Sequence, residues 1–70
     1  MKYVGVKEVL KAVRNNDVSK VYIGKDAETH VLTELITSCN EKNIEIVEIE
    51  TMQKLGEMAG IEVKAATAAE

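Results

Sequence analysis

The spacing of apolar residues predicts a helix from about Gly5 to Arg14. Apolar residues recur there at intervals of three and four, at Val6, Val9, Leu10 and Val13. This spacing gathers them on one stripe and leaves Lys7, Glu8 and Lys11 on another side. Two donors and one acceptor therefore stand together near a helix start, whose unpaired N–H groups and partial positive charge suit a phosphate-rich partner. Most polar helix faces are only solvated, so this pattern alone leaves both interpretations open.

Strand and helix patterns alternate farther along the chain. The β-branched and aromatic residues of Val18–Gly24 do not alternate strictly with polar ones, which predicts a strand covered on both faces. A second helix is predicted after Asp26, which can cap it, and Asn43 can end it. Ile44–Ile49 predicts a second strand. Strand, helix and strand within about thirty residues form a βαβ unit with parallel strands.

The remaining segments are short. Met1–Val4 predicts an extended segment, and Asn15–Asp17 is expected to stop the first helix because Asn tolerates the left-handed conformation. Thr51 can cap a third helix that ends at Gly60. The Ala-rich residues Ala65–Ala69 predict a brief last strand.

These elements predict an α/β fold, a single three-layer α/β/α sandwich whose small mixed sheet contains the parallel βαβ unit. Seventy residues leave no room for a second domain, so residues 1–70 are expected to form one domain. No stretch approaches the roughly 20 apolar residues of a membrane span, and nothing resembles a signal peptide. The single Cys excludes an internal disulfide. We therefore expect a cytoplasmic protein with no membrane partner.

Charge is distributed unevenly along the chain. The net charge of −3 argues against unspecific binding to phosphates. Residues 1–25, however, hold six Lys and Arg against two acidic residues, a local surplus of +4, whereas residues 26–70 have a balance of −7. One basic end on an acidic body is therefore predicted, and the basic end contains the first helix. An acidic body would repel RNA that does not fit, so binding should depend on shape.

Side chains suited to catalysis or metal binding do not cluster in the sequence. His30 is the only histidine and has no Cys or Ser near it in sequence, and Cys39 continues an apolar stripe as a small buried residue. Glu45, Glu48 and Glu50 straddle a strand without forming a recognisable acid/base pair. A zinc site needs about four ligands, and no phosphate-binding glycine motif is present. We expect no enzymatic activity, no cofactor and no metal.

Two corners that contain glycine leave alternatives open. Gly24–Asp26 lies at the carboxyl end of a parallel strand, where open α/β sheets place ligands, but it is equally consistent with an ordinary turn and helix cap. Gly60–Val63 places Ile61 and Val63 in a loop. These two side chains either pack against a partner or return to the core.

Four stretches, in this order, resemble the kink-turn RNA-binding family of the archaeal ribosomal protein L7Ae. They are Gly5–Val13, Val21–Glu28, Cys39–Ile44 and Leu55–Val63. The resemblance covers almost the whole chain and is greatest to the short bacterial relatives of the YbxF type. One departure is Lys7, where archaeal and eukaryotic members carry Asn and the bacterial relatives carry Lys.

The resemblance implies that the first helix inserts its N-terminal end into the widened major groove of a kink-turn, an RNA element bent at tandem sheared G·A pairs. A sheared pair leaves the guanine O6 and N7 acceptors and the N1–H donor free. Lys7 and Lys11 suit the acceptors and Glu8 suits the donor. Glu28 and Leu32 would face a flipped-out base, which the loop 61–63 would cover from the other side, with Lys64 near the backbone. The RNA-facing residues implied are Gly5, Lys7, Glu8, Lys11, Lys25, Glu28, Leu32, Ile61, Glu62, Val63 and Lys64.

The resemblance thus implies a monomeric RNA-binding protein that recognises and stabilises kink-turns of structured RNA, such as ribosomal RNA or a riboswitch, with no DNA partner. The alternative is a protein-interaction domain of the same fold that has lost RNA binding. The acidic balance of the chain supports this alternative. A third hypothesis, that the turn at Gly24 binds a small ligand, is supported by no sequence motif.

Overall fold

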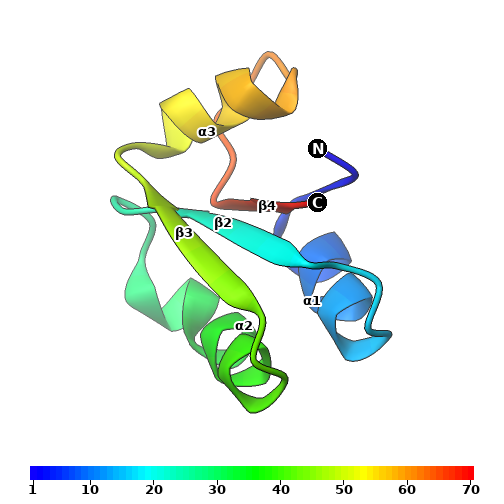
Figure 1. The fold of residues 1–70 in the computed structure, drawn as a ribbon. Helices are drawn as coiled ribbons and strands as arrows, with labels where there is room; N and C mark the ends of the chain where they lie inside the picture. The colour runs from blue at the N-terminus through cyan, green and yellow to red at the C-terminus, as the bar shows by residue number, and fades with distance from the viewer.

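The computed structural model describes all 70 residues as a sheet enclosed between helices (Figure 1). In chain order the elements are β1 (Tyr3–Val4), α1 (Val6–Arg14), β2 (Lys20–Gly24), α2 (Thr29–Glu41), β3 (Glu45–Ile49), α3 (Met52–Ala59) and β4 (Thr67–Ala69). Every predicted helix and strand is present, with ends that differ from the prediction by a few residues. None of the three helices is both long and apolar enough to cross a membrane.

The four strands lie in the order β1-β4-β2-β3. β2 and β3 are parallel and β4 is antiparallel to both of its neighbours, so the sheet is mixed and contains the predicted βαβ unit. Figure 1 shows α1 and α2 together on one face of this sheet and α3 on the other. The predicted three-layer α/β/α sandwich is confirmed.

The core has two parts, one on each face of the sheet. The larger part lies under α1 and α2, and its buried members are Val9, Val13, Val21, Ile23, Leu32, Leu35, Cys39 and Ala69. The smaller part lies under α3 and consists of Leu55, Ala65 and Ala68. Because the chain has no Phe or Trp, both parts are filled by small and aliphatic side chains. The predicted burial of Cys39 is confirmed.

The helix ends show where local sequence was a good guide and where it was wrong. Thr51 caps α3 by accepting the Lys54 N–H at 3.0 Å, and Gly60 ends it with a left-handed φ of 79°, both as predicted. Asp26, however, does not cap α2, whose N-cap is Glu28. Its Oδ1 instead accepts the N–H of Met52 at 2.8 Å, which is the first residue of α3. The reason is the sheet: the ends of β2 and β3 lie side by side, so the turn after β2 faces the start of α3.

Gly56 permits a close contact that fixes the loop before β4. A Cβ on Gly56 would lie 2.1 Å from the carbonyl oxygen of Val63, which is far inside van der Waals contact. The backbone of this loop therefore lies directly on α3 because position 56 has no side chain.

We expect Gly56→Ala to lower the free energy of unfolding by about 1 to 3 kcal/mol, because an extra methyl group in a filled space forces the backbone to move. Chemical denaturation measures this change. Gln53→Ala is the matched control on the exposed face of the same helix, with an expected change within about 0.5 kcal/mol. Equal stability of Gly56→Ala and the wild type would contradict the contact.

A side-chain contact joins the first strand to the α1–β2 turn. The hydroxyl of Tyr3 donates to Oδ2 of Asp17, and Nζ of Lys2 lies 3.5 Å from Oδ1 of the same carboxylate. The Tyr3 hydrogen bond, followed by the nearby Lys2 charge, holds the pKa of Asp17 below its ordinary value of 3.8. The same hydrogen bond raises the pKa of Tyr3.

The pKa of the Asp17 carboxyl is lower in the folded than in the unfolded protein. The carboxylate therefore contributes to stability above pH 3.8, and this contribution is lost as the pH falls through the pKa that Asp17 has in the folded protein. We expect Asp17→Asn to lower the midpoint of chemical denaturation at pH 7. The difference in midpoint between this variant and the wild type should be smaller at pH 2. Glu41→Gln, which removes an exposed unpaired carboxylate, is the control. A difference independent of pH would count against this linkage.

Candidate nucleic-acid interface

The order of the strands brings three separate segments to one edge of the sheet. β4 begins opposite the ends of β1 and β2, since Ala68 pairs with Val4 and Thr67 pairs with Ile23. The start of α1, the turn after β2 and the loop before β4 therefore lie at this edge. Two backbone hydrogen bonds of 2.9 Å hold them there, from Gly5 N–H to Thr67 O and from Gly24 N–H to Ala66 O.

Gly5 shapes the start of α1. Its φ of 100° lies in the region that residues with a Cβ rarely adopt, so the sharp change from strand to helix requires glycine. Its carbonyl accepts the N–H of Val9 at 2.9 Å, and no side chain caps the helix. The first N–H groups of α1 therefore have no side-chain acceptor and carry the partial positive charge of the helix end.

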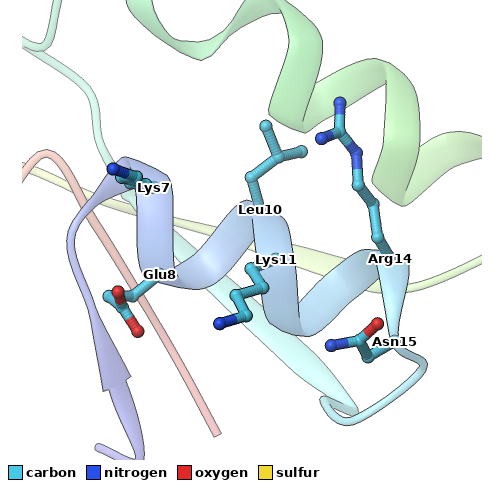
Figure 2. Close-up of a pocket in the computed structure, with 6 residues that line it drawn as sticks. All are labelled: Lys7, Glu8, Leu10, Lys11, Arg14 and Asn15. Atoms are coloured by element: carbon cyan, nitrogen blue, oxygen red, sulfur yellow. The ribbon is translucent and has the colours of Figure 1, made fainter.

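The exposed face of α1 carries unpaired charges of both signs. Lys7, Glu8 and Lys11 are exposed and take part in none of the ion pairs or side-chain hydrogen bonds of the structure. Figure 2 shows Glu8 and Lys11 extending to the same side of the helix, with Lys7 near its N-terminal end. A shallow hollow of about 390 Å³ follows this face and is lined by Lys7, Glu8, Leu10, Lys11, Arg14 and Asn15.

The turn between β2 and α2 contributes Lys25 and Glu28, both exposed. Glu28 is the N-cap residue of α2, and its Oε2 lies 3.4 Å from Nε2 of His30. Leu32 does not lie on this surface. Only 3% of it is exposed and it belongs to the core, so its side chain supports α2 from below.

The loop before β4 resolves the alternatives left open for its apolar residues. Ile61 is partly buried against the cluster around Leu55, so it returns to the core. Val63 does not, because it is 70% exposed. Glu62 and Lys64 are also exposed. This loop and α3 border a second hollow of about 470 Å³, lined by Gln53, Glu57, Ile61, Glu62, Val63 and Lys64.

Five lining residues were missed by sequence reasoning. On α1, Leu10 had been assigned to the apolar stripe, and Arg14 and Asn15 had been considered only at the helix end. The spacing of Lys7, Lys11 and Arg14 at i, i+4 and i+7 could have indicated that the basic face runs the length of the helix. Gln53 and Glu57 could not be found, because only the folded loop brings them beside residues 61–64.

The structure shows no grouping that resembles a catalytic or metal centre. His30 is exposed beside a single carboxylate, and burial raises the pKa of the Cys39 thiol, which disfavours the reactive thiolate. No three His, Cys, Asp or Glu side chains are arranged to hold a metal ion. The chemistry available at this edge is hydrogen bonding and charge.

Comparison with known proteins identifies the family. Residues 3–70 match the ribosomal protein L7Ae/L30e/S12e/Gadd45 family, and the chain belongs to it. It is 57% identical over 67 residues to an RNA-binding protein of Caldanaerobacter subterraneus subsp. tengcongensis, covering 96% of this chain and 82% of that protein. It is 41% identical over 66 residues to an RNA-binding protein of Halalkalibacterium halodurans, covering 94% of this chain and 80% of that protein. The family resemblance inferred from the sequence motifs is confirmed.

Solved structures show the same fold. A Giardia lamblia 15.5kD RNA binding protein superposes with a TM-score of 0.87 at 27% identity, over 94% of this chain and 56% of that one. A Bacillus halodurans protein of unknown function superposes with a TM-score of 0.84 at 27% identity, over 94% of this chain and 66% of that one. This chain thus spans between half and two thirds of each of these longer structures.

Proposed function

We propose that this protein binds RNA and that it recognises and stabilises kink-turns with tandem sheared G·A pairs, in ribosomal RNA or a riboswitch. Its family, and relatives that are named RNA-binding proteins, support the first part. The second part rests on the surface of α1 and on the resemblance of the sequence motifs to kink-turn-binding proteins.

The observation that carries the proposal is the free face of Lys7, Glu8 and Lys11 at the uncapped start of α1. A surface that only neutralised phosphates would need no carboxylate. The edge of a sheared guanine offers two acceptors and one donor, so a reader of that edge needs two cations and one anion. The α1 face supplies this combination within five residues, and no intramolecular partner occupies it.

The other two segments of the edge give the proposed interface its width. Lys25 lies in the turn after β2, where it can reach the RNA backbone, and Glu28 would face a flipped-out base. The exposed Val63 offers an apolar contact to the same base from the loop before β4. Leu32 acts in this proposal only by supporting α2 from the core.

The acidic body favours selection by shape. With a net charge of −3, the protein attracts RNA only where the basic face of α1 is presented correctly. It needs no catalytic step: because it binds the kinked form more tightly than the extended form, it shifts the equilibrium of the RNA between them.

We expect the protein to fold a kink-turn in buffer without Mg²⁺. A duplex labelled at both ends should show a saturable rise in energy transfer between its arms as protein is added. The control duplex has both G·A pairs replaced and should show no rise. Equal responses of the two duplexes would contradict kink-turn recognition, and absence of binding to either would favour the protein-interaction alternative.

We expect Glu8→Ala and Lys11→Ala each to weaken binding to the kink-turn by about 1 to 3 kcal/mol, because each removes a contact to a base edge. The same titration measures both. Lys42→Ala is the matched control: its Nζ is 2.8 Å from Oδ1 of Asn16, at the opposite edge of the sheet. A loss shared equally by kinked and unkinked RNA would show that these residues contact phosphates only.

A further inference from the structure

A basic stripe extends along the whole of α1. Lys7, Lys11 and Arg14 recur at i, i+4 and i+7, and with a rise of about 1.5 Å per residue the stripe is about 10 Å long. The hollow on this face continues past Lys11 to Arg14 and Asn15 (Figure 2). Its lining carries three cations and one anion in a protein whose net charge is negative.

Arg14 differs from the two lysines because it has an intramolecular partner. Its guanidinium forms an ion pair with Glu34 of α2, and Figure 2 shows the side chain leaning toward that helix. Both side chains are largely exposed, 58% for Arg14 and 65% for Glu34. Exposed ion pairs contribute little to stability, so Arg14 can exchange this carboxylate for another anion at small cost.

We infer that the RNA-binding surface continues along α1 to Arg14, that Arg14 contacts a backbone phosphate there, and that Glu34 competes with this phosphate for the guanidinium. This inference rests on the proposed function. Arg14 lies seven residues from Lys7, at the end of α1 away from the residues proposed to read bases. A contact at that distance positions the RNA without reading its sequence.

The charge of the helix end makes Arg14 necessary for this contact. The C-terminal end of a helix carries a partial negative charge, so the backbone there repels a phosphate. The planar guanidinium offers two parallel N–H groups to phosphate oxygens, and Asn15 adds a neutral amide beside it. Glu34 pairs with one nitrogen of this guanidinium in the free protein, which reduces attraction to phosphates that approach without the correct fit at Lys7 and Lys11.

The first test is the salt dependence of kink-turn binding. We expect Arg14→Gln to raise Kd by about three- to tenfold at low salt and to reduce the slope of log Kd against log salt by about 1. Arg14→Lys should keep the slope, because it keeps the charge, and should show an intermediate Kd. Lys20→Gln removes the same charge from the face of β2 that carries Tyr22 and packs under α3, away from α1, and should change neither quantity. An unchanged Kd and slope in Arg14→Gln would overturn the inference.

The second test isolates the competition with Glu34. We expect Glu34→Gln to lower Kd by about two- to threefold in the wild type and to have no effect in the Arg14→Gln background. Glu45→Gln removes an equal charge on β3, outside the ion pair, and should leave Kd unchanged in both backgrounds. An equal effect of Glu34→Gln in both backgrounds would show that Glu34 only repels the RNA in general. That result would overturn the inferred competition between Glu34 and a phosphate for Arg14.

These results separate this inference from the proposed function. If the wild type fails to fold the kink-turn, the proposed function itself is wrong. If the wild type folds it and Glu8→Ala impairs it while Arg14→Gln does not, only the extension to Arg14 is wrong.

Discussion

The pairing of β4 with two strands at once is the constraint on which the rest of the structure depends. All three of its residues pair with β2 on one side, and Ala68 and Ala69 also pair with β1 on the other. Thr67 also donates through its hydroxyl to the carbonyl of Tyr22 at 2.7 Å. Backbone hydrogen bonds from Gly5 to Thr67 and from Gly24 to Ala66 fasten the start of α1 and the end of β2 to this strand and the residue before it. The candidate interface exists because three residues near the end of the chain close the sheet.

The small size of these residues matters as much as their hydrogen bonds. Thr67, Ala68 and Ala69 are fully buried, with helices packed on both faces of the sheet. Larger side chains here would push α1 or α3 away from the sheet, since a packed interior has no spare volume. Gly56 applies the same principle on α3, where the absence of a side chain lets the loop before β4 lie on the helix. Close packing thereby fixes the loops that border the interface.

The charges fit a protein that binds selectively and not tightly to every phosphate. The cations lie mainly in residues 1–25, and most of the acidic residues lie in the remaining chain. Even within the basic face, Arg14 is balanced by Glu34. Such an arrangement weakens long-range attraction to nucleic acid and gives greater weight to short-range fit, where hydrogen bonds to base edges differ between one RNA shape and another.

The sequence by itself determined the helices, the strands and the grouping of Lys7, Glu8 and Lys11. These follow from the 3.6-residue period of a helix and from the preferences of Thr51 and Gly60 at its ends, which act over only a few residues. The tertiary structure alone decided that Asp26 accepts the N–H of Met52 at the start of α3 and that Glu34 pairs with Arg14. It also placed Leu32 in the core and drew three distant segments to one edge. The physical reason is range: spacing along the chain fixes which residues share a face of one element, whereas contacts between elements depend on strand order and packing, which no local pattern encodes.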